Sequence, residues 1–152
     1  MQEFIKEIIN NNILVSAFLG WITAQILKTI IYIIVNREFV PERLVGDGGM
    51  PSAHSATVMA MVTAIAYDYG VGSVEFAISF IFAVIVMHDA MGVRRETGKQ
   101  AVVINNIMEY FEELGKKPID VQLKEFVGHT PLQVTMGAIL GFIVGAIVIQ
   151  II

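Results

Sequence analysis

The stretch Gly46–Thr57 reads GDGGMPSAHSAT, and the rest of the chain is organised around it. Three glycines and a proline precede Ser52 and His54, and an apolar run with helical spacing follows directly. A hydroxyl and an imidazole therefore lie at the start of a helix, where unpaired N–H groups and the helix dipole favour an anion. We expect this stretch to form half of a phosphate site. The other half is expected at Gly128–Pro131 (GHTP), where the last apolar segment begins.

The composition is that of an integral membrane protein. The 152 residues are 55% hydrophobic and only 16% charged, and apolar runs near twenty residues long are typical of membrane spans. We expect one domain over residues 1–152. The chain has no cysteine, which excludes disulfides and thiolate metal sites. No basic stripe points to nucleic acid, and the first twelve residues do not resemble a signal peptide.

Four apolar segments are expected to cross the bilayer, which makes the fold class an all-α membrane helical bundle. They cover roughly residues 13–35, 51–67, 74–88 and 132–152. Between the last two, residues 101–114 have the spacing of a cytoplasmic amphipathic helix, and residues 1–12 that of a short helix on the membrane surface. Glycine recurs every fourth residue in the last segment, which suits close helix–helix contact in lipid.

The order of the segments brings distant polar residues together. Spans joined in series alternate in direction, so the end of the first, the start of the second, the end of the third and the start of the fourth share one side of the bilayer. Several ionisable residues scattered along the sequence belong near these four ends. They are Lys28, His54, Asp89, Arg94, Arg95 and His129.

The distribution of positive charge predicts which side this is. The loops on the shared side carry Arg37, Arg43, Arg94, Arg95, Lys99, Lys116, Lys117 and Lys124. The opposite side has only Lys6, near the terminus. By the positive-inside rule the shared side is cytoplasmic. We therefore expect a protein of the bacterial plasma membrane whose site faces the cytoplasm.

The two histidines on this shared side are candidates for chemistry. An imidazole titrates near neutral pH and can protonate a leaving alkoxide. Two histidines in different roles can also divide phosphoester hydrolysis into two easier steps. Each has a simpler interpretation: His54 as a helix-start residue bonded to a backbone carbonyl, and His129 as a helix cap at the membrane surface. Their occurrence on one predicted face favours the chemical role.

The basic side chains near the histidines suit a phosphate. A lysine at the bilayer centre costs about 2.5–3.5 kcal/mol on insertion scales, so we expect Lys28 to bind the anion rather than only to snorkel. At least one of Arg94 and Arg95 is expected to clamp phosphate, because guanidinium forks match tetrahedral oxyanions; the simpler interpretation is a basic pair that sets orientation. Asp89 is expected to pair with these arginines or to orient a catalytic histidine. This cationic company favours an anion over a metal ion, and no metal or cofactor is expected.

The motifs resemble those of a known superfamily. Pro51–His54 (PSAH) resembles the Pro-Ser-Gly-His motif of the type 2 phosphatidic acid phosphatase and vanadium haloperoxidase superfamily. His129–Val134 resembles its third motif, and Lys28 stands for the lysine of the first. Asp89–Arg95 (DAMGVRR) is most similar to a small divergent branch of short integral membrane proteins, a likeness that spans nearly the whole chain.

The resemblance implies a phosphatase-like domain that hydrolyses a phosphomonoester or pyrophosphate of a lipid without a metal ion. By this likeness His129 is the nucleophile that forms a phosphohistidine, and His54 is the general acid. Lys28, Ser52 and the backbone of Gly48 and Gly49 would hold phosphate oxygens. The implied partners are the bilayer and a phosphorylated lipid, either a glycerolipid or a polyprenyl phosphate; the sequence leaves a homo-oligomer open.

This chain also departs from the superfamily pattern. Val35–Asn36 stands in place of the first motif's Arg-Pro, Leu123 in place of the third motif's Arg, and Gln133 in place of its nucleophile-orienting Asp. Arg94 or Arg95 would supply the missing charge from the preceding span. The departures support a second hypothesis, a lipid- or anion-binding membrane protein that keeps the pocket without turnover. A small transporter or channel subunit is the third, and four short spans leave it little room for a pore.

Overall fold

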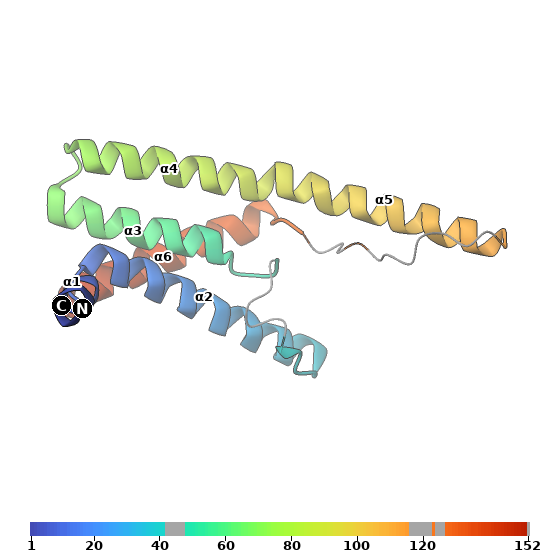
Figure 1. The fold of residues 1–152 in the computed structure, drawn as a ribbon, viewed down its shortest axis with the longest axis horizontal. Coiled ribbons are helices and arrows are strands. Elements are labelled where there is room, and N and C mark those ends of the chain that lie inside the picture. Colours follow the sequence, from blue (N-terminus) through green and yellow to red (C-terminus); the bar gives the residue numbers. More distant parts are fainter. Residues whose placement is uncertain (42–47, 116–122, 124–126, 152) are drawn as a thin grey trace.

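The computed structural model describes residues 1–41, 48–115, 123 and 127–151, and its regular elements there are all helices (Figure 1). They are α1 (Gln2–Ile9), α2 (Asn12–Asn36), α3 (Ala53–Tyr69), α4 (Val74–Met91), α5 (Val93–Glu113) and α6 (Pro131–Ile151). The expected all-α class is confirmed. Some residues used above lie outside the described residues, namely Arg43, Gly46, Asp47, Lys116, Lys117 and Lys124.

Helices α2, α3, α4 and α6 lie side by side and alternate in direction (Figure 1). The end of α2, the start of α3, the end of α4 and the start of α6 therefore lie at one end of the bundle, which we call the site end. The two termini lie together at the other end (Figure 1). Helix α3 is central: it packs against α2, α4 and α6, whereas α2 and α4, both fully described, do not pack against each other.

Three helices within the described residues are long and apolar enough to cross a membrane. They are α2, the continuous helix formed by α4 and α5, and α6. The fourth expected span, α3, has 17 residues, about 25 Å at 1.5 Å per residue, which is at the lower limit for crossing a bilayer. The bundle thus has a short central helix with three longer ones around it.

Helix α5 begins earlier than the sequence pattern predicts. The amphipathic pattern predicts a separate helix from residue 101, but α5 begins at Val93 and continues α4 through Gly92. The intervening Arg, Glu, Lys and Gln residues favour helix and outweigh Gly98, which lies within α5. Together α4 and α5 form a helix of 40 residues, about 60 Å long, and α5 extends beyond the site end (Figure 1). Asn105 of α5 exchanges two hydrogen bonds with the backbone of Leu123, at 2.9 and 3.0 Å.

Glycines of α6 allow its backbone to meet that of α3. A Cβ added at Gly141 would lie 2.9 Å from the Cα of Ala56, and one at Gly145 would lie 2.8 Å from the carbonyl oxygen of Ala60. Both alanines are fully buried. This packing of small residues is a common way for helices to associate in lipid. We call the contact the glycine seam; in it Gly137, Gly141 and Gly145 of α6 meet Ser52, which caps α3, and Ala56 and Ala60 of α3.

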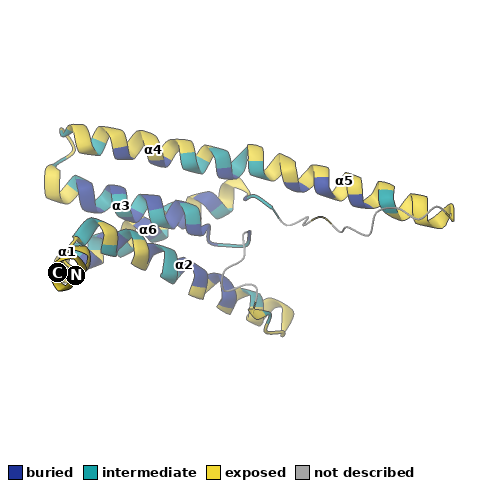
Figure 2. Ribbon diagram, in the orientation of Figure 1, coloured by how far each residue is buried: buried dark blue, intermediate teal, exposed yellow. Residues whose placement is uncertain are grey.

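Burial is concentrated on α3 and on the sides of α2 and α6 that face it, while α4 and α5 are exposed over most of their surface (Figure 2). Many of the exposed side chains of α4 are large and apolar, including Ile78, Ile81 and Ile85. Because lipid tails are as apolar as these side chains, such a surface is the expected exterior of a membrane bundle. The short α1 has no buried residue.

Candidate functional site

A cavity of about 440 Å³ lies between α2, α3 and α4 at the site end. Its polar walls come from segments far apart in the sequence. They comprise Gln25 and Lys28 of α2, His54 and Thr57 of α3, and His129 just before α6. Trp21, Val58, Phe82 and Val86 supply its apolar walls. The cavity is therefore polar on one part of its surface and apolar on another.

The two histidines face each other inside this cavity. Their ring centroids are 5.9 Å apart and the ring planes meet at 66°. His54 lies in the first turn of α3, and His129 directly precedes α6 and is only 3% exposed. The two rings that the alternation of the helices was expected to bring together therefore do meet, and both line the same cavity.

Backbone contacts hold His129 against the junction of α4 and α5. Its N–H donates to the carbonyl oxygen of Ala90 at 2.9 Å. The preceding Gly128 has φ +86°, and a Cβ there would overlap the backbone of Arg95. Only glycine combines this left-handed conformation with so close an approach. The glycine of the GHTP motif is thus needed to bring the histidine to the cavity.

Gln133 has a structural role that the sequence comparison did not suggest. Its side-chain oxygen accepts from the N–H of Thr130 at 2.9 Å, and its own N–H donates to the Thr130 hydroxyl at 3.4 Å. This reciprocal pair is a capping box for α6, with Pro131 at the first helical position. The same side-chain oxygen lies 3.4 Å from Nδ1 of His129. An amide oxygen therefore lies where the superfamily pattern has a carboxylate.

Lys28 lines the cavity about two turns before the end of α2, roughly 12 Å along the axis. It is 4% exposed. A Cβ on Gly49 would lie 2.9 Å from Cγ and Cδ of this lysine, so the glycine backbone packs directly on its aliphatic part. Gly48 and Gly49 both have φ +82°, which glycine adopts without strain. The GG loop thus folds over Lys28, and Gly48 itself lines the cavity.

Ser52 joins α3 to α6. It is fully buried, caps α3 by accepting from the N–H of Ser55 at 3.3 Å, and donates its own N–H to the carbonyl oxygen of Gln133 at 3.0 Å. It is not among the residues that line the cavity. The contact between Ser52 and phosphate that the resemblance implies stays a prediction.

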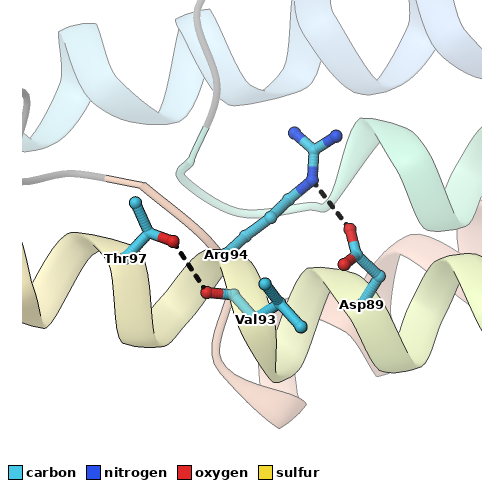
Figure 3. Close-up of polar contacts among 4 residues, drawn as sticks. All are labelled: Asp89, Val93, Arg94 and Thr97. Atoms are coloured by element: carbon cyan, nitrogen blue, oxygen red, sulfur yellow. Dashed lines mark hydrogen bonds and ion pairs between the residues drawn. The ribbon is translucent and has the colours of Figure 1, made fainter.

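Asp89 and Arg94 form an ion pair at the site end, with Nε 3.0 Å from Oδ2 (Figure 3). Both side chains are partly exposed, at 44% and 42%, and neither lines the cavity. Of the two expectations for Asp89, pairing with an arginine is the one observed. The terminal nitrogens of Arg94 point away from Asp89 (Figure 3). Arg95 is exposed, and its backbone supports Gly128.

Sequence reasoning missed the rest of the cavity wall. Trp21, Gln25 and Lys28 recur at spacings of four and three residues, so they share one face of α2. Phe82 and Val86 do the same on α4. The signal was present as a stripe that includes Lys28, but an apolar helix carries several such stripes. Which one faces a cavity is decided by the packing of the neighbouring helices.

Histidine and carboxylate side chains do not gather into a group of three or more anywhere in residues 1–41, 48–115, 123 and 127–151. The groups that do converge are two imidazoles, an ammonium and a glycine backbone. Donors of this kind suit an anion.

Fold and site together define a helical integral membrane protein with a paired-histidine cavity at one end of its bundle. The chain matches the model of the Divergent PAP2 family over residues 9–144, and it belongs to that family. It is also 40% identical over 147 residues to the uncharacterized membrane protein YuiD of Bacillus subtilis (strain 168), a match that covers 90% of this chain and 93% of YuiD. No solved structure matches the chain. The expected resemblance to the divergent branch is confirmed.

Proposed function

We propose that this protein is a metal-independent phosphatase that hydrolyses a phosphomonoester or pyrophosphate of a membrane lipid. The observation that carries the proposal is the pair of facing imidazoles, 5.9 Å apart, in a cavity that also contains Lys28. A nucleophile and a proton donor within reach of one phosphorus atom are what a two-step phosphoester hydrolysis requires.

In the proposed mechanism His129 attacks phosphorus and the bond to the leaving oxygen breaks. That oxygen takes a proton from His54, and a phosphohistidine remains. Water then attacks the phosphohistidine while His54 accepts its proton, and inorganic phosphate leaves with the original imidazole restored. Because the Gln133 oxygen lies beside Nδ1 of His129, Nε2 is the attacking atom.

The negative charge of the phosphate would be met by several groups of the cavity wall. Lys28 supplies an ammonium, and the Gly48 backbone lies beside it. The first turn of α3 contributes the positive end of its dipole. Arg94 is within the same end of the bundle, with its terminal nitrogens directed away from Asp89 (Figure 3). We assign Arg94 the role of a clamp at the cavity mouth.

An amphiphilic substrate agrees with the shape of the cavity. Its apolar walls, from Trp21, Val58 and Phe82, continue from the polar ones toward the middle of the bundle. The positive charge of the loops at the site end would place the reaction at the cytoplasmic surface of a bacterial plasma membrane. The leaving group is therefore a lipid alcohol or lipid phosphate whose chain stays in the bilayer.

The test is phosphate release by the purified protein in detergent, with a chelator present, from a panel of lipid phosphates and pyrophosphates. We expect His129→Ala to lower turnover by at least about a thousandfold. His88→Ala is the matched control, because the third histidine of the chain is exposed on α4 and outside the cavity. Full turnover by the His129→Ala protein, or a strict need for added metal, would contradict the mechanism.

A second candidate is binding of a lipid phosphate without turnover. It is favoured by Gln133, whose side chain caps a helix and presents an uncharged oxygen to His129. Vanadate or phosphate binding with no hydrolysis of any lipid in the panel would support this candidate.

A further inference from the structure

We propose that helix α5 is a dimerisation helix, and that it pairs with α5 of a second copy of this chain in the same membrane. The surface concerned is the α5 stripe, which consists of Val103, Ile107, Tyr110 and Leu114. These four side chains are between 48% and 60% exposed. The inference goes beyond the proposed function, because the stripe lies outside the cavity and its pairing does not depend on hydrolysis.

The α5 stripe lies outside the bilayer. Helix α4 has 18 residues and is about 27 Å long, so it nearly fills the hydrocarbon core of about 30 Å by itself. The charged residues from Arg94 to Lys99 follow directly. Val103 lies about 18 Å past Met91, the end of α4, whereas the headgroup layer adds only roughly 5–8 Å on each side. Because α5 continues α4 beyond the site end (Figure 1), the stripe is apolar surface exposed to water rather than to lipid.

The protein's own chain contacts the opposite face of α5. Ala101 and Asn105 are buried there, and Asn105 exchanges its two hydrogen bonds with the backbone of Leu123. Tyr110 follows Ala101 by nine residues, which is two and a half helical turns, so the two side chains point in opposite directions. The same holds for Asn105 and Leu114. The contact with Leu123 therefore does not cover the α5 stripe.

The spacing of the stripe suits a second, identical helix. Its residues recur at intervals of four, three and four, which is the spacing that places an apolar seam between two helices of a coiled coil. Two copies in one membrane have the same orientation. A twofold axis along the membrane normal therefore brings their α5 helices together parallel and in register. In that arrangement the stripe is complementary to itself, with each apolar side chain beside its own counterpart.

The charges of α5 permit this pairing. Glu109 and Glu112 lie on the half of the helix away from the stripe, and Glu113 lies at its edge, so these carboxylates do not oppose their counterparts across the seam. Toward the bilayer the side that carries the stripe also carries Glu96, whose carboxylate lies 2.6 Å from Nζ of Lys99. Its charge is therefore compensated within each helix. The seam is short, but confinement of both copies to one bilayer raises their effective concentration.

Single-cysteine variants test the contact directly, because the chain has no cysteine of its own. Full-length Ile107→Cys is reconstituted in vesicles of phosphatidylethanolamine and phosphatidylglycerol and oxidised with copper phenanthroline. We expect a disulfide-linked dimer on a non-reducing gel, because seam residues related by the twofold axis come within disulfide distance. Glu109→Cys is the matched control, since Glu109 is exposed on the same helix but faces away from the stripe. It should give at least about tenfold less dimer.

The strength of the contact is measured by energy transfer between donor-labelled and acceptor-labelled copies diluted in the same vesicles. We expect Ile107→Glu to weaken dimerisation about tenfold or more, because it places two carboxylates in an apolar seam. Val102→Glu is the matched control, since Val102 is also exposed on α5 but lies off the stripe, and its dimerisation should stay within about twofold of wild type. Neither position is buried, so the melting temperatures of both variants should equal that of wild type.

The possible results are separate from those that test the proposed function. Seam-specific crosslinking that Ile107→Glu weakens would support the dimer even in a protein that hydrolyses nothing. A monomeric wild type, a dimer that survives Ile107→Glu, or equal crosslinking from Ile107→Cys and Glu109→Cys would overturn it, whatever the turnover. Quenching of a dye on Ile107→Cys by spin-labelled lipid would place α5 on the membrane surface and would also contradict the dimer.

Discussion

The two sides of α3 differ in how closely the neighbouring helices pack against them. On one side, Ala56 and Ala60 meet glycines of α6 so closely that a Cβ would overlap backbone atoms. On the other side, His54 and Val58 face a cavity of about 440 Å³. One helix of 17 residues thus has a dry contact on one face and an open site on the other.

The difference indicates how a small membrane protein keeps a cavity open. Without a hydrophobic driving force between helices in lipid, association depends on close packing. The glycine seam provides that packing, and it fixes α3 and α6 at the ends from which both histidines project. The cavity side then needs few contacts of its own. We expect changes on the seam side to affect stability and changes on the cavity side to affect chemistry.

On the cavity side, His54→Ala is expected to have a large effect, second only to that of His129→Ala. Loss of a general acid lowers the rate of alkyl ester hydrolysis by about 10²–10⁴. An aryl phosphate needs no proton on its leaving oxygen, so its hydrolysis should fall much less. Measuring turnover of both substrates tests the assignment, and thermal unfolding should stay unchanged. An equal loss with both substrates would show that His54 does not act as the general acid.

On the seam side, Gly141→Val is expected to lower the stability of the protein rather than its catalytic rate. The new side chain would meet the backbone of Ala56, and overpacking of this kind costs about 1–3 kcal/mol or more. We expect a lower melting temperature in detergent, with loss of activity only as the folded fraction falls. Gly72→Val is the matched control, because a Cβ at Gly72 meets nothing within 4 Å. Equal melting temperatures for the two variants would contradict the seam.

The smallest effect is expected at Gln133, which caps α6 and also contacts His129 of the cavity. Gln133→Glu keeps the oxygen that caps α6 and adds a charge beside Nδ1 of His129. Since charge-assisted hydrogen bonds are stronger than neutral ones, we expect turnover to rise about tenfold. Gln133→Leu should instead lose about 1 kcal/mol of stability with the cap. Turnover by Gln133→Glu at or below the wild-type level would mean that the ring needs no carboxylate.

Much of the fold follows from the sequence because the apolar segments are long and uniform. The bounds of the expected spans agree with α2, α3, α4 and α6 to within three residues. The meeting of His54 and His129 was predictable too, since it needs only alternation of four helices. The position of Lys28 in the cavity wall was also predictable, because a lone lysine in an apolar helix is expected to face the interior of the bundle rather than lipid.

The remaining features depend on contacts that a one-dimensional pattern does not contain. The contact of Ser52 with phosphate stays a prediction, and the structure adds two contacts that the sequence did not reveal: its side chain caps α3, and its N–H donates to the backbone of Gln133. Asp89 had two expected partners, and its ion pair with Arg94 is set by the continuous α4–α5 helix. The capping box of Thr130 and Gln133 was readable in the sequence as TPLQ, but comparison with a catalytic motif drew attention away from it.

The position of Trp21 has a practical consequence. It is the single tryptophan of the chain, it lies in the apolar wall of the cavity, and its ring stacks on Phe18 at 5.9 Å. The tryptophan fluorescence of the native protein therefore comes from the wall of the cavity alone. Its emission wavelength reports the polarity of that spot, so occupancy of the cavity can be followed optically without attaching a dye.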